Sequence, residues 1–196
     1  MGPTRLVVAT RNEHKLRELE QILAGVELAP LPDDVELPPE TGDTFEANAL
    51  GKARAARAAT GEPAIADDSG IGAAALGGAP GVRSARYAGP GATDRQNLEL
   101  LLSKVDGKVD RSVAFVCAIA YIDYAGAEWV FEGICEGTLA EVPRGSGGFG
   151  YDPAFIPREI GDGRTMAELE PAEKHAVSHR GRAAALLAHH LGLESP

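Results

Sequence analysis

The sequence predicts an α/β protein with a mixed central sheet and flanking helices. Short apolar segments with the composition of buried strands alternate with amphipathic or alanine-rich segments, an order typical of α/β folds. Two longer apolar segments, 113–121 and 128–135, flank the turn at 123–126 and predict a β-hairpin, so the sheet is expected to be mixed. With 196 residues, the chain is expected to form a single domain, 1–196, or one domain with two lobes.

The first elements follow from an apolar segment and a helical stripe. Residues 5–10 predict a strand covered on both faces, and Asn12 is expected to cap the helix that follows. Apolar residues at i, i+3, i+6 and i+7 give this helix one stripe, formed by Leu16, Leu19, Ile22 and Leu23. Gly25 ends it, a second strand is expected at 26–31, and the proline-rich, acidic segment 32–43 predicts a loop.

The middle of the chain predicts a helix, a strand and an irregular stretch. An alanine-rich helix is expected from Thr44 to about Ala59, ended by Gly61. The strand 63–66 runs directly into Asp67-Asp68-Ser69-Gly70, which we expect to cap its end. The segment 71–92 is rich in glycine and alanine, and we expect it to be irregular.

Three further elements complete the expected fold. Thr93 and Asp94 predict the N-terminus of a helix that runs to about Lys104. After the hairpin, 154–156 predicts a short strand, and the last helix is expected at 178–191.

Composition and charge limit the classes of partner. The net charge of −10 disfavours a polynucleotide partner, because nonspecific binding to duplex nucleic acid needs a basic face. The longest apolar run, 113–122, is too short to cross a bilayer, and no secretory signal is visible. Cys117 and Cys135 lie in apolar runs without metal-type spacing and are expected to be buried thiols. We therefore expect a cytoplasmic protein.

The segment 10–15 joins a strand to the start of a helix. Such a start presents free N–H groups and aligned peptide dipoles, which attract anions. Asn12 and Lys15 are therefore candidates to contact phosphate; the alternative is that Asn12 only caps the helix and Lys15 is only solvated. Lys52 is a second phosphate candidate, with a solvated helix face as its alternative, and Arg54 cannot share its face.

A group of carboxylates lies near the strand at 63–66. Asp67 and Asp68 are neighbours and should point to opposite faces, so only one of them aims at a given point, and the residues alone do not decide which. Glu40 precedes the helix of Lys52 and can approach the same place. Oxygen ligands of this kind suit Mg²⁺ bound to substrate phosphates, and a second carboxylate role is general base on water. The alternative is an Asp pair that caps turn amides.

The C-terminal half carries candidates for binding a planar ring. Phe149 lies between two glycines, so a base can stack on it, and Asp152 can hold a base edge or orient a donor, whereas Tyr151 is a candidate core residue. The alternatives are a surface turn at 145–150 and a helix cap at Ser178. Donors that suit the O6 atom of a 6-oxo purine follow, namely Lys174, His179 and Arg180. A base pocket and a phosphate cradle on one chain predict a nucleotide substrate.

These residues belong to an ordered set of motifs. They are Thr-x-Asn-x-x-Lys at 10–15, Glu40-Thr41-Gly42, Asn48-Ala49 with Lys52-Ala53, Ala66-Asp67-Asp68-Ser69-Gly70, Gly77-Gly78-Ala79-Pro80-Gly81, Ser84-Ala85-Arg86-Tyr87, Gly147-Gly148-Phe149-Gly150-Tyr151-Asp152-Pro153, Ala172-Glu173-Lys174 and Ser178-His179-Arg180-Gly181. The set resembles the inosine/xanthosine triphosphate pyrophosphatase family, the noncanonical purine NTP pyrophosphatases, over residues 5 to about 190. Each motif alone is weak, but the ordered set is specific.

The resemblance implies a hydrolase that acts on phosphoric anhydride bonds. It implies Mg²⁺-dependent hydrolysis of dITP, ITP and XTP to the monophosphate and pyrophosphate, which keeps deaminated purines out of the nucleotide pool. It also implies an elongated two-lobed fold with the active-site cleft between the lobes, and a homodimer. Two alternatives are a pyrophosphatase for other modified or ordinary nucleotides, and a nucleotide sensor without turnover.

The resemblance also assigns roles to residues. It implies that Glu40 and Asp68 bind the metal and that Asp68 is the catalytic proton acceptor, which decides between Asp67 and Asp68. The implied substrate-binding residues are Thr10, Arg11, Asn12, Glu13, His14, Lys15, Lys52, Ser69, Phe149, Gly150, Tyr151, Asp152, Lys174, His179 and Arg180. Two departures stand out: Arg11 replaces a small residue, so its side chain must point away or join the phosphate contacts, and 72–75 is less β-branched than usual.

Overall fold

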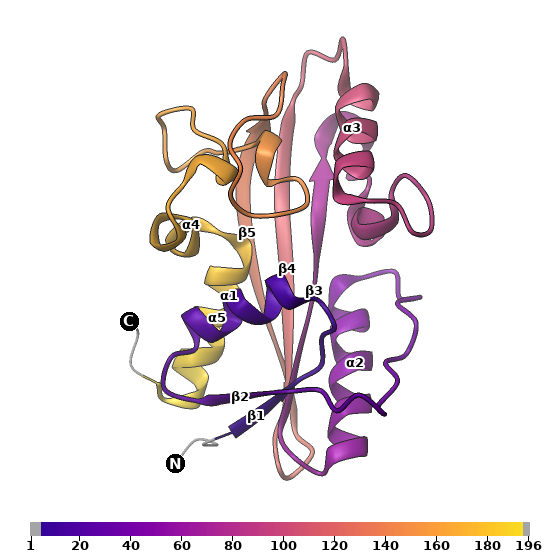
Figure 1. Cartoon of the computed structure of the whole chain (residues 1–196), viewed down its shortest axis with the longest axis vertical. Coiled ribbons are helices and arrows are strands. Elements are labelled where there is room, and N and C mark those ends of the chain that lie inside the picture. Colours follow the sequence, from indigo (N-terminus) through magenta and orange to yellow (C-terminus); the bar gives the residue numbers. More distant parts are fainter. Residues whose placement is uncertain (1–4, 194–196) are drawn as a thin grey trace. The chain divides into compact units, whose positions relative to one another are not determined.

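The structure, a computed structural model that describes residues 5–193, has the mixed α/β architecture that the sequence predicts (Figure 1). Among the described residues, six strands form one sheet in the order β2-β1-β3-β4-β5-β6. β1 pairs in parallel with β2 and β3, whereas β5 and β6 are antiparallel. The strands are β1 (Arg5–Val8), β2 (Glu27–Pro30), β3 (Ala64–Ala73), β4 (Ser112–Ile122), β5 (Glu128–Leu139) and β6 (Phe155–Pro157).

The helices follow the expected order, with one addition. They are α1 (Glu13–Ile22), α2 (Phe45–Thr60), α3 (Asp94–Val105), α4 (Pro171–Val177) and α5 (His179–Leu191). The sequence analysis did not anticipate α4, a short helix with a proline in its first turn that ends immediately before α5. The expected irregular segment 71–92 is partly ordered, because β3 continues to Ala73 and 3₁₀ turns follow at 74–76 and 81–86.

The chain divides into two compact units. Within the described residues, unit 1 contains 5–68, 117–133 and 180–193, and unit 2 contains 69–116 and 134–179. The chain passes from one unit to the other within β3, within β4, between Gly133 and Ile134 of β5, and between His179 and Arg180. Each unit has its own core.

One face of the sheet in unit 1 is covered by α2 through very small side chains. Ala49, Ala53 and Ala56 lie on one face of the helix and are fully buried against alanines of β3 and β4. The helix begins at its cap Thr44, whose hydroxyl accepts from the amide of Ala47, and ends at Gly61 in the left-handed conformation. The small size of these three side chains lets α2 lie close to the sheet where they pack.

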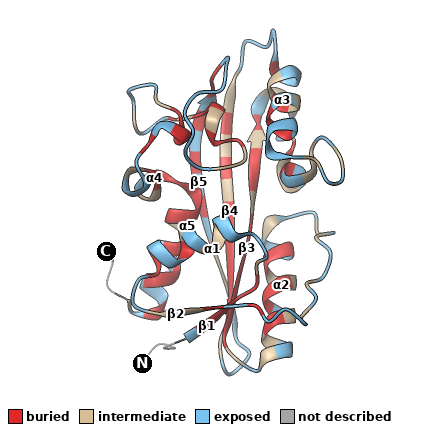
Figure 2. Ribbon diagram, viewed as in Figure 1, coloured by how far each residue is buried: buried red, intermediate tan, exposed pale blue. Residues whose placement is uncertain are grey.

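The opposite face of the sheet in unit 1 is covered by α1 and α5, which lie side by side in Figure 1. Leu19 of α1 and Leu187 of α5 are fully buried in the same cluster as Leu6, Ile65 and Ile119 of the strands. Because helices cover both faces, residues 117–122 of β4 are all buried, whereas residues 112–116 in unit 2 alternate between buried and half-buried (Figure 2).

The core of unit 2 packs α3 and α4 onto the strands. Leu101 of α3 and Val177 of α4 share one cluster with Phe115 and Phe155, whose ring centroids lie 4.4 Å apart. Gly137 of β5 leaves room for this packing, because a Cβ atom there would lie 2.8 Å from Cζ of Phe155. The hairpin predicted between β4 and β5 is confirmed, since the amide of Asp123 donates to the carbonyl of Ala127.

Both cysteines are buried free thiols, as expected. Cys117 lies in unit 1 and Cys135 in unit 2. Burial raises the pKa of the Cys117 thiol to about 12, so this thiol stays protonated and unreactive at neutral pH. No helix within residues 5–193 is both long and apolar enough to cross a membrane.

The packing of α1 gives a test of the unit 1 core. Leu19→Ala is expected to lower the free energy of unfolding by about 2–5 kcal/mol, because the lost side chain is fully buried and leaves a cavity. The control Leu186→Ala, on α5, removes a side chain that is half exposed and should change it by less than about 0.5 kcal/mol. Urea unfolding measured on both variants would contradict this packing if their losses were equal.

Candidate functional site

Asp67 and Asp68 lie inside β3 rather than at its end. The strand continues to Ala73 because Ile71 and Ala73 extend its apolar pattern into the core of unit 2. The prediction that the Asp pair caps the strand is therefore wrong. The expectation that the two side chains point to opposite faces is confirmed, because each contacts a different set of residues.

Asp67 is the centre of a buried ion-pair network in unit 1. Its Oδ2 atom lies 3.0 Å from Nζ of Lys15 and accepts hydrogen bonds from Nε and Nη2 of Arg180 at 3.2 and 2.9 Å. The third guanidinium nitrogen, Nη1, donates to Oε2 of Glu18 at 2.6 Å. The side chain of Arg180 is 2% exposed and that of Asp67 is fully buried, so α1, β3 and α5 meet at one set of charges.

The charges around Asp67 keep it ionised. Burial alone would raise the pKa of this carboxyl group, but the positive charges of Lys15, Arg180 and Lys52 outweigh burial and hold the pKa well below its usual range. Asp67 is therefore a permanent anion at neutral pH, which suits it to holding cations rather than to accepting a proton.

Asp68 contacts residues of α2 instead. Its Oδ2 atom accepts from Nδ2 of Asn48 at 2.8 Å, and its Oδ1 atom lies 4.0 Å from Nζ of Lys52. The same ammonium donates to Oε1 of Glu40 at 2.5 Å and to the backbone carbonyl of Asp67 at 2.7 Å. The ammonium of Lys52 thus holds together the two carboxylates that the family resemblance assigns to metal binding. Lys52 and Arg54 lie on different faces of α2, as expected, and Arg54 pairs with Glu128.

The pKa of Asp68 is shifted in the opposite direction to that of Asp67. Burial raises the pKa of Asp68, the ammonium of Lys52 lowers it, and the nearby carboxylate of Glu40 raises it again, with a net increase. A carboxylate with a raised pKa is a better proton acceptor than an ordinary aspartate. Burial lowers the pKa of Lys52, but the carboxylates of Asp67 and Glu40 raise it by more, so the net shift is upward and Lys52 stays charged.

The charges of this cluster nearly balance. It contains three cations, Lys15, Lys52 and Arg180, and four carboxylates, Glu18, Glu40, Asp67 and Asp68. Within residues 5–193, no group of three or more His, Cys, Asp or Glu side chains is arranged to hold a metal ion. A pair of carboxylates is nevertheless what Mg²⁺ commonly takes from a protein when substrate phosphates supply further oxygens.

The turn between β1 and α1 has the structure of a capped helix start. Asn12 is the cap, and its Oδ1 atom accepts from the amides of His14 and Lys15 at 2.9 and 3.3 Å, while the Thr10 hydroxyl accepts from the amide of Asn12. His14 is exposed, and the exposed Glu13 pairs with Arg17. Capping by Asn12 is confirmed, and its contact with phosphate stays a prediction.

A second group of predicted residues lies in unit 2. The Oδ2 atom of Asp152 accepts from the amide of Phe149 at 2.9 Å and from Nζ of Lys174 at 2.8 Å. This ammonium lies 5.3 Å from the centre of the Phe149 ring. Gly148 has a φ of +69°, which only glycine adopts easily, and the turn it forms folds the Phe149 amide back onto Asp152.

The remaining predicted residues of unit 2 have different surroundings. Tyr151 is buried in the core and its hydroxyl donates to the carbonyl of Ser84, so it serves packing, one of the roles considered for it. His179 is buried and stacks on Phe115, with centroids 4.5 Å apart. The amide of Gly150 donates to Asp94, and Ser69 is half-buried in β3.

The predicted base-binding residues do not all belong to one unit. Phe149, Asp152, Lys174 and His179 lie in unit 2, whereas Arg180 lies in unit 1, where it binds Asp67 and Glu18. The predicted phosphate and metal residues lie together in unit 1.

Sequence reasoning overlooked two residues of the unit 1 cluster. Glu18 pairs with Arg180, and Asn48 donates to Asp68 while its Oδ1 atom accepts from the amide of Gly42. Helical spacing was an available signal for both, since Glu18 follows Lys15 by three residues and Asn48 precedes Lys52 by four.

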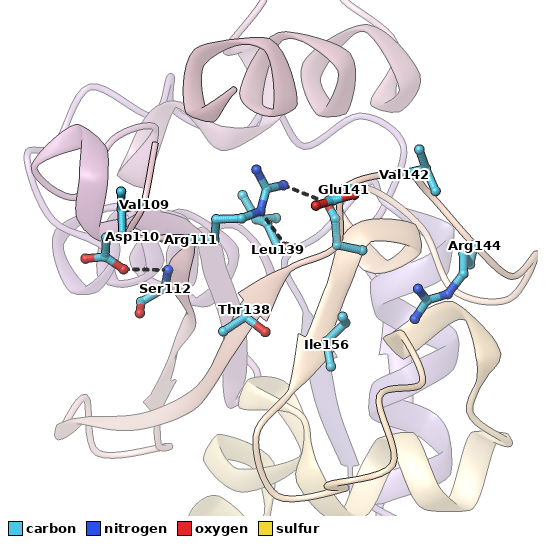
Figure 3. A pocket seen from close by; sticks show the side chains of 11 residues that line it. Val109, Asp110, Arg111, Ser112, Thr138, Leu139, Glu141, Val142, Arg144 and Ile156 are labelled. Atoms are coloured by element: carbon cyan, nitrogen blue, oxygen red, sulfur yellow. Dashed lines mark hydrogen bonds between the residues drawn. The ribbon is translucent and has the colours of Figure 1, made fainter. Parts of the chain in front are cut away.

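A pocket of about 600 Å³ lies elsewhere in unit 2, lined by residues of 109–112, 138–142, Arg144 and Ile156 (Figure 3). Its lining shares no residue with the predicted site. The guanidinium of Arg111 donates to the carbonyls of Leu139 and Ala140, as the close-up shows, and that of Arg144 binds Glu168. Both guanidinium groups are therefore engaged within the protein.

Comparison with known proteins identifies the chain's relatives. The sequence pattern of the Ham1 family matches residues 6–190. The chain belongs to the Ham1 family. A protein of Mycobacterium bovis named dITP/XTP pyrophosphatase is 53% identical over 94% of this chain and 93% of its own length. One of the same name from Geobacter sulfurreducens is 51% identical over 96% and 97%.

The fold of the Ham1 family is also found in solved structures. A HAM1 protein from Coxiella burnetii superposes with a TM-score of 0.87 at 42% identity, covering 96% of this chain and 98% of the other. The family resemblance predicted from the ordered motifs is therefore confirmed, as is the mixed α/β fold.

The Asp67 network gives a test of stability and its pH dependence. Asp67→Asn is expected to lower the free energy of unfolding at pH 7 by about 3 kcal/mol, because it leaves the buried Arg180 poorly compensated. The pKa of Asp67 is depressed by folding, so its contribution is complete above the unfolded value of about 3.9 and is lost as the pH falls below it. The difference between wild type and variant should therefore shrink below about pH 4.

Urea unfolding at pH 7, 5 and 3 measures this difference. The control Arg95→Ala breaks the exposed pair with Glu99 and should change the free energy of unfolding by less than about 1 kcal/mol. A difference between wild type and Asp67→Asn that is the same at all three pH values would show that Asp67 is not the depressed carboxyl group described here.

Proposed function

We propose that the chain hydrolyses noncanonical purine nucleoside triphosphates, namely dITP, ITP and XTP, to the monophosphate and pyrophosphate. The observation that carries this proposal is the convergence of Glu40 and Asp68 on the ammonium of Lys52, next to the Lys15–Asp67 pair. Two relatives about half identical over nearly the whole chain bear the name dITP/XTP pyrophosphatase, which supports the substrate class. Such an activity keeps deaminated purines out of the nucleotide pool.

Glu40 and Asp68 would hold Mg²⁺. Two features of unit 1 support this cofactor: an ammonium already joins the two carboxylates, and the cluster has one carboxylate more than it has cations, so it cannot by itself neutralise a triphosphate. When bound, the ion would offset phosphate charge and favour formation of hydroxide from water.

Asp68 would accept the proton from the attacking water. Its position beside Glu40 and Lys52 suits this role, and the hydrogen bond from Asn48 fixes the orientation of the carboxyl group. Asp67, whose pKa is depressed, would stay ionised and hold Lys15. Lys15 and Lys52, together with Thr10, Asn12, Glu13 and His14 of the turn before α1, would bind the phosphates, whereas the guanidinium of Arg11 in the same turn binds the carbonyls of Leu31, Pro32 and Val35.

Unit 2 would bind the base. Phe149 offers a ring for stacking, and Lys174, with its ammonium near this ring, offers a donor to O6 of a 6-oxo purine. His179 would be a further donor, with Ser69, Gly150, Tyr151 and Asp152 beside the substrate. Arg180 would also donate to the base, although its guanidinium is bonded to Asp67 and Glu18 in this structure.

We further propose a homodimer that acts in the cytoplasm on free nucleotides. The net charge of −10 supports small substrates, offset locally by Lys15 and Lys52, rather than a polynucleotide partner. No membrane partner is proposed.

The proposed substrate class is tested by pyrophosphate release with Mg²⁺ from ITP, XTP, ATP and GTP at one concentration. We expect ITP and XTP to react at least about a hundredfold faster than ATP, because an adenine amino group would leave donors facing donors in the pocket. Equal rates on all four nucleotides would support the proposed hydrolysis and contradict the proposed selectivity for 6-oxo purines. No release from any of them would leave a nucleotide sensor.

The role of Asp68 is tested separately. Asp68→Asn should lower kcat by about 10²–10⁴-fold, because the amide cannot accept the proton, while ITP binding measured by calorimetry changes little. The control Asp106→Asn makes the same substitution at an exposed residue that ends α3 and should leave kcat unchanged. A near-normal kcat in Asp68→Asn would remove Asp68 from the proton-transfer step.

A further inference from the structure

Arg11 does not extend toward the unit 1 cluster of lysines and carboxylates. Its guanidinium donates from Nη1 to the carbonyl of Leu31 at 2.9 Å, and from Nη2 to the carbonyls of Pro32 and Val35 at 2.6 and 2.9 Å. Nη1 also lies 3.5 Å from Oδ1 of Asp33. The side chain of Arg11 therefore binds three carbonyl groups of the segment 31–35, although this side chain is nearly half exposed.

The segment 31–35 begins the loop that carries Glu40. This loop runs from the end of β2 to the start of α2, and its described internal backbone hydrogen bonds are local: Val35 donates to Pro32 and Thr41 to Pro39. Side chains from outside hold the loop at three places. Arg11 binds its start, Lys52 binds Glu40, and Asn48 accepts from the amide of Gly42 near its end.

We propose that Arg11 is a positioning residue that fixes the loop of Glu40 against the phosphate turn 10–15. The inference rests on the proposed function, because Glu40 as a metal ligand and the turn as a phosphate site must be held at a fixed separation. Lys52 and Asn48 both belong to α2, so they tie the loop to the helix that follows it and, through Asp67 and Asp68, to β3. Arg11 is the contact that ties the loop to the turn preceding α1, where Lys15 and Asn12 lie.

An arginine is required for this contact. Its planar guanidinium presents several donors in fixed directions, which matches three carbonyl groups at the corners of one turn. A lysine has the same charge but places its donors on one atom at the end of a flexible chain, so it cannot reproduce the set. A phosphate ligand behaves differently, since a lysine replaces an arginine there as a source of charge.

The contact itself is tested by hydrogen exchange on the full chain without metal or nucleotide. In Arg11→Ala, the amides of Val35 and Thr41 should exchange at least about tenfold faster, because charge-assisted hydrogen bonds that hold the loop are lost. The control Arg5→Ala removes the same charge from β1, where Arg5 pairs with Glu27 and is similarly exposed, and should leave these amides unchanged. Unchanged exchange in Arg11→Ala would overturn the proposal.

The effect on the reaction is tested by titrating Mg²⁺ in pyrophosphate release from ITP. Arg11→Ala and Arg11→Lys should both need several times more Mg²⁺ for half-maximal rate, with KM for ITP at saturating Mg²⁺ within about twofold of wild type. A raised KM that Arg11→Lys restores would make Arg11 a phosphate ligand and overturn the proposal, as would an unchanged Mg²⁺ requirement. No turnover by the wild type would refute the proposed function instead, and the exchange comparison would then decide alone whether Arg11 holds the loop.

Discussion

The structure of unit 1 depends on two adjacent carboxylates in the middle of a buried strand. Burying an ionised carboxylate is strongly unfavourable unless it is paired and hydrogen-bonded. Because neighbouring strand residues face opposite sides of a sheet, Asp67 and Asp68 cannot share one set of partners. Each helical layer must therefore supply its own: α1 and α5 give Lys15 and Arg180 to Asp67, and α2 gives Asn48 and Lys52 to Asp68. Asp67 and Asp68, whose burial without partners would be unfavourable, therefore connect α1, α2 and α5 to the sheet.

The two carboxylates are thereby given different chemistry. Asp67 is surrounded by cations, which hold its pKa low and keep it charged. Burial raises the pKa of Asp68, and the carboxylate of Glu40 adds to this increase, despite the ammonium of Lys52. Environments that push the pKa values of neighbouring titratable groups apart are typical of catalytic sites, where one group stays an anion and the other exchanges a proton. The division of roles between Asp67 and Asp68 thus follows from which side of β3 each one faces.

Local patterns in the sequence predict the helices and strands, but they do not predict the side-chain contacts between them. The strand–helix alternation, the Asn12 cap, the helix start near Thr44 and the hairpin all depend on residues near one another in the chain, and each is confirmed. The continuation of β3 to Ala73 was overlooked because glycine and alanine are weak strand formers, and packing in the unit 2 core overrides that preference. The Arg180–Glu18 pair joins residues far apart in sequence, so no local pattern predicts it; likewise, the choice of Asp68 over Asp67 came from the family resemblance rather than from the residues.

The balance of charges indicates how a polyanion would enter unit 1. Every cation of the cluster is already paired, so a phosphate that takes over a cation completely must draw it away from a carboxylate. The cost of doing so rises with burial, because a buried carboxylate left without its partner is poorly solvated. Lys15 is the most exposed of the three, at 15% against 8% for Lys52 and 2% for Arg180, and Asp67 keeps Arg180 when Lys15 leaves. Lys15 is therefore the cation that can turn to a phosphate at the lowest cost, whereas Arg180 is the one whose release would leave Asp67 least compensated.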